Sequence, residues 1–304
     1  MDLSTEIMRA IEDMGFDAPS TVQMKTIPLM MRGADINAIA PTGTGKTCAF
    51  GIPMLEYVQL NDSRIQEVVL APTRELALQI GDELTRLAKY IKGVRIAVLY
   101  GGQPISRQLN SIKRKPQIIV ATPGRLLDHI DRGNVRLDAV HTMVLDEADE
   151  MLNMGFVKDV TKIIEFTPND RQLVLFSATT NQDVLTIAWK YQHDPVEITV
   201  EATKEDRPQI AQYVIATERD KKTDDLLYIL DSDVYQRIMI FCNTKFMTDK
   251  LTSRLKKEGY SAECLHGDIR QSQHNVVMSD FRRGKFPILV STDVAARGID
   301  VDDV

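Results

Sequence analysis

The residues best suited to bind a phosphate group form a glycine-rich loop near the amino terminus. The loop follows a short apolar run at 36–39 and reads Ala40-Pro41-Thr42-Gly43-Thr44-Gly45-Lys46-Thr47. Its glycines let the backbone curl so that N–H groups point at an anion, and the helix predicted to open at Lys46 adds a partial positive charge. Lys46 would reach the terminal phosphates, and the Thr47 hydroxyl would ligand Mg²⁺. This order predicts a nucleoside triphosphate site, although Ala40 replaces the first glycine of the general pattern.

Three carboxylates follow a second apolar run, in the sequence Val144-Leu145-Asp146-Glu147-Ala148-Asp149. If that run is a buried parallel strand, its end faces the same sheet edge as the phosphate loop. Asp146 would then hold Mg²⁺, and Glu147 would orient and deprotonate the attacking water. An acidic helix amino terminus has the same composition, but the phosphate loop upstream in the same domain favours the catalytic interpretation.

Length and composition indicate an ordinary intracellular protein. The chain has 304 residues, of which 43% are hydrophobic and 26% charged, enough for two domains with full cores. No apolar run approaches the length of a membrane span, and the three well-separated cysteines indicate neither disulfides nor a zinc site. We therefore expect a reducing compartment and a cytoplasmic location.

The net charge of −6 excludes a basic body that would hold nucleic acid by bulk charge. Any binding of nucleic acid must therefore come from local loops. The one basic cluster is Lys113-Arg114-Lys115, for which a solvated loop is the simpler interpretation.

Alternating apolar runs and helical patterns predict two α/β domains in tandem, each with a parallel sheet covered by helices. In the first domain we expect strands at 36–39, 68–71, 96–100, 118–121, 142–145, 173–176 and 196–200, and helices at 4–14, 22–31, 48–58, 74–91, 105–111, 125–131, 157–166 and 182–190. In the second we expect strands at 210–216, 238–241, 262–265 and 288–291, and helices at 221–230, 245–258 and 271–281. A polar linker at 201–209 sets the domains at 1–204 and 210–304. Because such a domain normally has further elements, we expect the second to be truncated.

The order of these motifs resembles that of the DEAD-box RNA helicases of superfamily 2, over nearly the whole chain. Residues 16–23 look like the adenine-reading Q motif, Ala40–Thr47 like motif I with the alanine usual in this family, and Asp146-Glu147-Ala148-Asp149 like the name-giving motif. The further matches are Pro72-Thr73-Arg74-Glu75-Leu76, Gly101-Gly102, Thr122-Pro123-Gly124-Arg125, Ser177-Ala178-Thr179, Ile240–Lys245, His266-Gly267-Asp268 and Ser291–Asp300. Each match alone is weak, but their order and spacing together are specific.

The resemblance implies two RecA-like domains that bind ATP with Mg²⁺. The amide of Gln23 can both donate and accept, so it could read N6 and N7 of adenine together. Phe16 could pack on the base, or it could be a core residue after a helix end. In the second domain, Gly298 and Asp300 are the candidates for contact with the nucleotide, and Arg297 could pair with a carboxylate of the first domain or form an ordinary ion pair.

The hydroxyls of Ser177 and Thr179 are implied to lie near the carboxylates. They could relay the state of Asp149 to the second domain. A turn of small residues after a strand is the alternative interpretation of Ser177 and Thr179.

The resemblance also implies contacts with single-stranded RNA and short RNA duplexes. The candidates are Thr73, Arg74, Gly102, Thr122, Gly124 and Arg125 in the first domain, and Asn243, Gly267 and Thr292 in the second, with Lys245 as a further one. Glycines allow backbone N–H groups to approach phosphates closely, and such contacts carry no base information. We therefore expect sequence-independent binding, with the helix after Gly124 bending one strand.

Three departures from the family pattern affect these expectations. His274 stands where the family usually has an arginine, which would weaken an RNA or interdomain contact or make it pH-dependent. The aromatic residue usually found upstream of the Q motif would precede Met1. The sequence given ends before motif VI, whose arginine fingers are typically worth about 10³–10⁵ in rate. We therefore expect this chain to bind ATP but to hydrolyse it poorly.

The sequence predicts an ATP-dependent RNA helicase whose domains close on ATP and RNA and separate short duplexes locally. An ATP-gated RNA clamp with little unwinding would use the same motifs, so the sequence leaves that alternative open. A DNA helicase fits less well, because the Q motif and the Asp-Glu-Ala-Asp set point to RNA.

Overall fold

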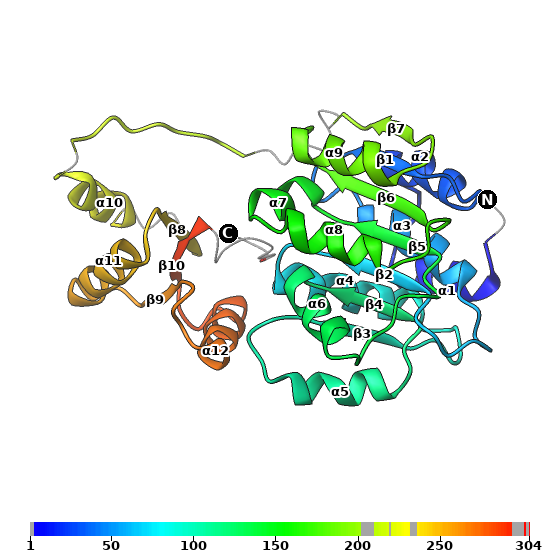
Figure 1. Cartoon of the computed structure of the whole chain (residues 1–304). Coiled ribbons are helices and arrows are strands. Elements are labelled where there is room, and N and C mark those ends of the chain that lie inside the picture. The colour runs from blue at the N-terminus through cyan, green and yellow to red at the C-terminus, as the bar shows by residue number, and fades with distance from the viewer. Residues whose placement is uncertain (1–2, 202–209, 219, 232–235, 294–300, 302–303) are drawn as a thin grey trace. The chain divides into compact units, whose positions relative to one another are not determined.

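The computed structural model describes residues 3–201, 210–218, 220–231, 236–293, 301 and 304. It divides into two compact units, Met1–Pro208 and Gln209–Val304. Each unit has its own parallel sheet, as Figure 1 shows. Within the described residues, no helix has both the length and the apolar character needed to cross a membrane.

The first unit is a seven-stranded parallel sheet in the order β3-β4-β2-β5-β6-β1-β7. Its strands are β1 (Ile36–Ile39), β2 (Glu67–Leu70), β3 (Ile96–Leu99), β4 (Ile118–Ala121), β5 (Thr142–Leu145), β6 (Gln172–Ser177) and β7 (Val196–Thr199). Its helices are α1 (Thr5–Asp13), α2 (Thr21–Met30), α3 (Lys46–Tyr57), α4 (Arg74–Leu87), α5 (Ile105–Lys113), α6 (Pro123–Asp131), α7 (Ala148–Asn153), α8 (Val157–Glu165) and α9 (Gln182–Tyr191). The expected α/β class with a parallel sheet is confirmed.

Successive residues of the central strands pack against opposite layers of helices, because side chains alternate between the faces of a strand. Val69 and Val144 pack in one core cluster with residues of α1 to α4. Val68 and Met143 pack in the other cluster, with residues of α6 to α9. Strands covered on both faces explain why the sequence shows continuous apolar runs here rather than alternation.

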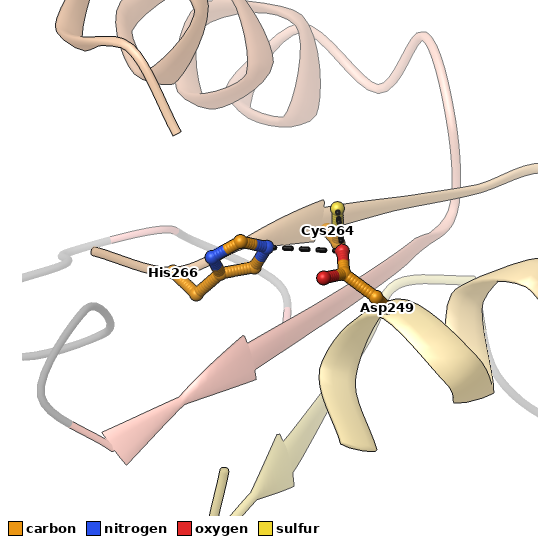
Figure 2. A group of neighbouring side chains, drawn as sticks. All are labelled: Asp249, Cys264 and His266. Carbon is orange, nitrogen blue, oxygen red and sulfur yellow. Dashed lines mark hydrogen bonds and ion pairs between the residues drawn. The ribbon is translucent and has the colours of Figure 1, made fainter. Parts of the chain in front are cut away.

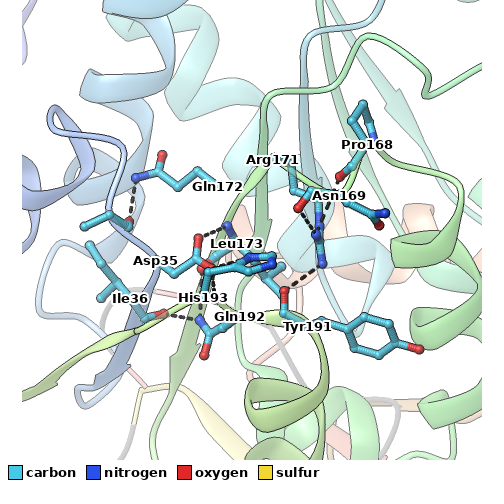
Figure 3. Close-up of polar contacts among 11 residues, drawn as sticks. Asp35, Ile36, Pro168, Asn169, Arg171, Gln172, Leu173, Tyr191, Gln192 and His193 are labelled. Atoms are coloured by element: carbon cyan, nitrogen blue, oxygen red, sulfur yellow. Dashed lines mark hydrogen bonds and ion pairs between the residues drawn. The ribbon is translucent and has the colours of Figure 1, made fainter.

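The amino ends of β1, β6 and β7 are joined by buried polar side chains (Figure 3). Asp35 accepts hydrogen bonds from the backbone N–H groups of Leu173 and His193, each at 2.7 Å. Gln192 donates to the carbonyls of Ile36 and Leu173, both at 2.9 Å. This network fixes the amino edge of the sheet and so positions β1, whose opposite end carries the phosphate loop.

The second unit contains a three-stranded parallel sheet in the order β8-β10-β9. Its elements are α10 (Lys222–Leu230), β8 (Ile238–Cys242), α11 (Lys245–Lys257), β9 (Ala262–Leu265), α12 (Gln271–Arg282) and β10 (Ile288–Thr292). One core cluster joins the sheet to α10 and α11, and the other joins it to α12.

The strand expected at 210–216 is wrong. Residues 210–218 belong to no strand, and Tyr213 and Val214 are 84% and 98% exposed. A strand requires a paired neighbour for its backbone groups, and the described strands β8 and β9 both pair with β10 instead. The short helix α7 is a second difference, because its six residues directly after the acidic motif were not expected to be helical.

Candidate nucleotide site and RNA-binding loops

The loop between β1 and α3 has the backbone that the glycine spacing predicts. Gly43 and Gly45 have φ values of +78° and +86°, in the left-handed region that favours glycine. A Cβ on Gly45 would lie 2.6 Å from the Gln23 side-chain nitrogen. Glycine is therefore required at position 45 for two reasons: it allows the left-handed turn into α3, and it leaves room for the Gln23 side chain of α2.

The rest of the loop is held from both sides. Ala40 is fully buried, and its N–H donates to the Ser177 carbonyl at 2.9 Å across the sheet. The Thr44 hydroxyl donates to the Pro41 carbonyl at 2.8 Å, whereas Thr42 is exposed. The loop thus presents its middle to solvent while its base is anchored in the core.

Gln23 contacts the phosphate loop directly. Its Nε2 donates to the Gly45 carbonyl at 3.1 Å, and its Oε1 accepts from the Ser20 N–H at 3.0 Å. The Ser20 hydroxyl donates to the Thr44 carbonyl at 2.7 Å and also caps α2. Ser20 was not among the predicted residues, although Ser-x-x-Gln before an apolar run is a visible capping-box signal. Phe16 is 46% exposed, so its interpretation as a core residue is wrong.

Lys46 and Asp146 meet at the carboxyl edge of the sheet. They follow β1 and β5, between which β6 lies, and Lys46 Nζ is 3.8 Å from Asp146 Oδ1. Both side chains are buried, with 7% and 4% exposed. Burial raises the pKa of Asp146, and the charge of Lys46 opposes that shift. A buried acid with so few donors favours a further cation, and Thr47 at the start of α3 offers a second hard oxygen ligand.

Glu147 caps α7 with a left-handed backbone, at φ +50°. Its N–H donates to Asp146 Oδ1 at 3.0 Å. Burial raises the pKa of Glu147, and the neighbouring Asp146 charge adds to the rise. A positive φ at a bulky residue is strained, so the fold holds this carboxylate at the sheet edge against a local cost.

Asp149 is joined to the turn after β6. Its Oδ2 accepts from the Thr179 N–H at 2.9 Å and from the Thr179 hydroxyl at 2.7 Å. The Ser177 hydroxyl donates to the Thr179 carbonyl. The structure therefore brings Asp149, Ser177 and Thr179 together from two motifs that lie about 30 residues apart in the sequence. Their role as a relay to the second domain remains a prediction.

The RNA candidates of the first unit lie on loops at the same carboxyl edge. Thr73 caps α4 after β2, Gly102 with φ +80° follows β3, and Thr122 follows β4 with its N–H donating to the Leu99 carbonyl at 3.0 Å. Arg125 donates from Nη2 to the Gln103 carbonyl at 2.9 Å, which ties two of these loops together. Gly124 is exposed.

Arg74 lies at the start of α4 and stacks on an aromatic ring. Its guanidinium carbon is 4.7 Å from the centroid of the Tyr100 ring. This contact joins the loop after β2 to the end of β3, so the predicted RNA residues of the first unit form one edge.

The candidates of the second unit follow its three parallel strands in the same manner. Asn243 follows β8, Gly267 follows β9, and Thr292 ends β10, so all three lie at one sheet edge. Lys245 forms an ion pair with Asp268, and a Cβ on Gly267 would lie 3.6 Å from the Lys245 side chain. The predicted Gly298 and Asp300, like Arg297, lie outside the described residues.

The loop that carries Gly267 is anchored by a polar group, which Figure 2 shows. His266 Nε2 lies 3.0 Å from Asp249 Oδ1 on α11, and the Cys264 thiol donates to the same oxygen at 3.6 Å. The three donor atoms lie within 4.8 Å of one another, as a metal site would require. A metal-binding histidine usually donates its other ring nitrogen to an acceptor, whereas His266 Nδ1 is buried without a partner among the described residues. We therefore assign the group a role in fixing the loop.

Comparison with known families agrees with this geometry. Residues 20–187 match the family model described as DEAD/DEAH box helicase, and residues 221–304 match the helicase conserved C-terminal domain. The first match spans more than half of the chain, so the chain belongs to the DEAD/DEAH box helicase family.

Two curated relatives are similar along the whole chain. The DEAD-box ATP-dependent RNA helicase CshA of Geobacillus kaustophilus is 46% identical over 304 residues, which are 100% of this chain and 65% of that protein. The ATP-dependent RNA helicase CshA of Listeria monocytogenes is 43% identical over 302 residues, 99% of this chain and 58% of that protein. This chain therefore spans less than two thirds of the length of these relatives.

Solved structures show the same fold. The chain matches Saccharomyces cerevisiae Dbp5, in a structure bound to RNA and ADP BeF3, with a TM-score of 0.86 and 32% identity over 99% of this chain and 77% of that one. It matches a DEAD box protein from the hyperthermophile Methanococcus jannaschii with a TM-score of 0.64 and 41% identity, over 100% of this chain and 82% of that one. Both solved structures thus resemble this chain in sequence as well as in their RecA-like fold.

Proposed function

We propose that the protein is an ATP-dependent RNA helicase, which couples the binding and hydrolysis of ATP to sequence-independent RNA binding and local unwinding of short duplexes. The meeting of Lys46 with Asp146 at 3.8 Å carries this proposal. The same sheet edge carries Thr73, Gly102 and Thr122, so one set of parallel strand ends supports both nucleotide and RNA candidates. The relatives named RNA helicases support the assignment to RNA.

The residues of the loop fit ATP with Mg²⁺. The backbone N–H groups around Gly43 and Gly45 would bind phosphates, and Lys46 would bind the terminal ones. Asp146 and the Thr47 hydroxyl offer the oxygen ligands that Mg²⁺ prefers. The metal ion supplies charge neutralisation at the reacting phosphate. Gln23 lies beside the loop and would bind the adenine once its amide exchanges Ser20 and Gly45 for the base.

Glu147 is the proposed general base. Its raised pKa makes the carboxylate a stronger proton acceptor than an exposed one, as an attacking water requires. Asp149, through Thr179, would pass the state of this acidic motif to the turn after β6. That turn is the proposed route by which nucleotide state reaches RNA binding.

The test is ATP turnover by the full-length protein, with and without single-stranded RNA. We expect RNA to raise turnover severalfold and single-stranded DNA to have a much smaller effect. Turnover that is indifferent to RNA would count decisively against an RNA helicase. Displacement of one strand from a short RNA duplex then separates a helicase from an ATP-gated clamp.

Glu147→Gln is the matched variant for this test. The amide keeps the size of the side chain but cannot accept the proton, so turnover should fall about 10²–10⁴-fold. ATP binding, followed by equilibrium titration with a fluorescent analogue, should persist. Near-normal turnover by the variant would show that Glu147 is not the base.

A further inference from the structure

One long segment of this acidic protein contains no acidic residue. Residues 84–127 hold no Asp or Glu, although the chain has a net charge of −6. The segment carries the cations Arg86, Lys89, Lys92, Arg95, Arg107, Lys113, Arg114, Lys115 and Arg125. It includes the two predicted RNA loops around Gly102 and Thr122. It also includes the cluster at 113–115, to which the proposed function gives no role.

The helix α5 connects these features. It begins three residues after Gly102 and ends at Lys113, and it packs against β3 at the border of the sheet (Figure 1). Arg107 and Arg114 lie seven residues apart, which places them on one helix face, with Asn110 between them. All three are exposed. One face of α5 therefore carries polar and cationic side chains from the RNA loop to the basic cluster.

The cations on and beside α5 have no carboxylate partner within the part of the chain that the structure describes. By contrast, Lys89 of the same acid-free segment pairs with Asp13, and Lys162 on α8 pairs with Asp131. Among the described residues, no Asp or Glu lies within ion-pair distance of the five cations that we call the basic ridge, namely Arg95, Arg107, Lys113, Arg114 and Lys115. Arg95 is part of it because its Nε donates to the Lys115 carbonyl at 2.9 Å. Uncompensated cations at a surface attract a polyanion.

The ridge is held rigidly beside the predicted RNA loops. Gln108, 3% exposed on the inner face of α5, donates to the Tyr100 carbonyl at 2.8 Å. Its Oε1 lies 3.1 Å from Nε2 of His129, which is fully buried on α6. Because α6 begins with Pro123 and Gly124, these contacts fix α5 relative to both loops. A surface fixed in this way binds at little cost in conformational entropy.

The geometry points to the basic ridge as a second RNA-backbone site, which extends the path of the RNA from Gly102 along α5 by contacts with phosphates. This inference rests on the proposed function, because it continues the RNA path of the motif loops. The nine residues of α5 span about 14 Å. At about 3.4 Å per phosphate along one strand, that length corresponds to about four nucleotides.

The experiment compares binding of an RNA series of about 4 to 20 nucleotides to wild type and to a triple variant, Arg107→Gln, Lys113→Gln and Arg114→Gln. A control variant, Arg32→Gln, Arg86→Gln and Lys190→Gln, removes three exposed cations elsewhere in the first unit and changes the net charge equally.

The ridge variant should bind the shortest RNAs as wild type does. It should lose about 10- to 100-fold in affinity for the longest RNA at 0.1 M salt, since three charges contribute a salt slope of about 2. Its affinity should also stop rising about four nucleotides earlier along the series. The control should follow wild type.

Equal affinity of ridge and control variants for the long RNA would overturn the inference while leaving the proposed function intact. A wild-type protein that binds no RNA of any length would instead overturn the proposed function, and the inference with it. Melting temperatures of both variants, measured alongside, confirm that folded proteins are compared.

Discussion

The two edges of the seven-stranded sheet both bury an aspartate, and they treat it differently. At the amino edge, Asp35 is 5% exposed and accepts two backbone N–H groups at 2.7 Å. At the carboxyl edge, Asp146 is 3% exposed and has one backbone donor, with Lys46 farther away at 3.8 Å. The first carboxylate is satisfied by the protein itself, whereas the second retains capacity for a ligand.

The difference shows how burial alone fails to identify a functional acid. A buried carboxylate stabilises the fold when backbone donors surround it, because each such bond is charge-assisted. A buried carboxylate with few donors costs stability, as the raised pKa of Asp146 indicates. The number of donors, rather than the exposed area, separates a structural acid from a binding one.

Glu67 adds a third case, at the amino end of β2. Its carboxyl group is completely buried, and burial raises its pKa well above the ordinary value. Its closest ionisable neighbour is His141, whose Nδ1 lies 3.2 Å from Glu67 Oε1. Glu67 therefore adopts the neutral acid form more readily than a solvated glutamate, and no predicted ligand residue adjoins it.

The largest expected effect comes from changing the functional aspartate. Asp146→Asn should lower ATP turnover by roughly 10²–10³-fold. The neutral amide binds a divalent cation more weakly than the carboxylate does, and it removes one negative charge from the site. Its melting temperature should change less than that of Asp35→Asn, because the removal of a poorly solvated charge offsets the loss of the ion pair with Lys46. Steady-state ATP turnover and thermal unfolding of the variant test the two expectations. A variant that loses stability but keeps its turnover would show that Asp146 has the structural role that we assign to Asp35.

The same substitution at the amino edge should have the opposite signature. Asp35→Asn replaces one acceptor oxygen by an N–H₂ group that faces a backbone donor, and should cost about 2–4 kcal/mol in free energy of unfolding. Chemical denaturation measures this loss. ATP affinity at temperatures where the variant is folded should change little, and a specific loss of ATP binding without lost stability would contradict the structural role.

The smallest effect is expected at Glu67, and it depends on pH. Because the pKa of Glu67 is raised in the folded state, the folded protein binds this proton more tightly than the unfolded chain. The free energy of unfolding therefore falls as pH rises from about 4.3 towards the folded-state pKa. Glu67→Gln should remove that decline and so raise the free energy of unfolding at neutral pH. Denaturation curves at several pH values test this, and an unchanged pH slope would disprove it.

Much of the fold could be predicted because local patterns decide it. The apolar runs gave the strands of both sheets, and glycine and serine signals placed the ends of several helices. The strand expected at 210–216 failed because apolar residues such as Val214 favour a strand without specifying a neighbour to pair with. The helix α7 was missed because six residues are too few for a helical period to be visible.

The sequence predicted most residues of the candidate site, but it did not predict the contacts between them. Motif spacing identified Gln23, Lys46, Asp146 and Thr179, but nothing in it shows that Gln23 bonds to Gly45 or that Thr179 bonds to Asp149. The acid-free segment was visible in the sequence, whereas its meaning depends on α5 being fixed to α6 through Gln108. Side-chain contacts between distant segments depend on packing, which local pattern does not encode.

The sequence by itself determined the family, the kinds of element and the order in which chemical groups appear along the chain. Only the tertiary structure decided which of them meet. The strand order, with β6 between β1 and β5, brings Lys46 to Asp146 across 100 residues of sequence and leaves Asp35 at the opposite edge. The physical reason is that parallel strands align their ends, so position along a strand fixes the edge, and strand order fixes the neighbour.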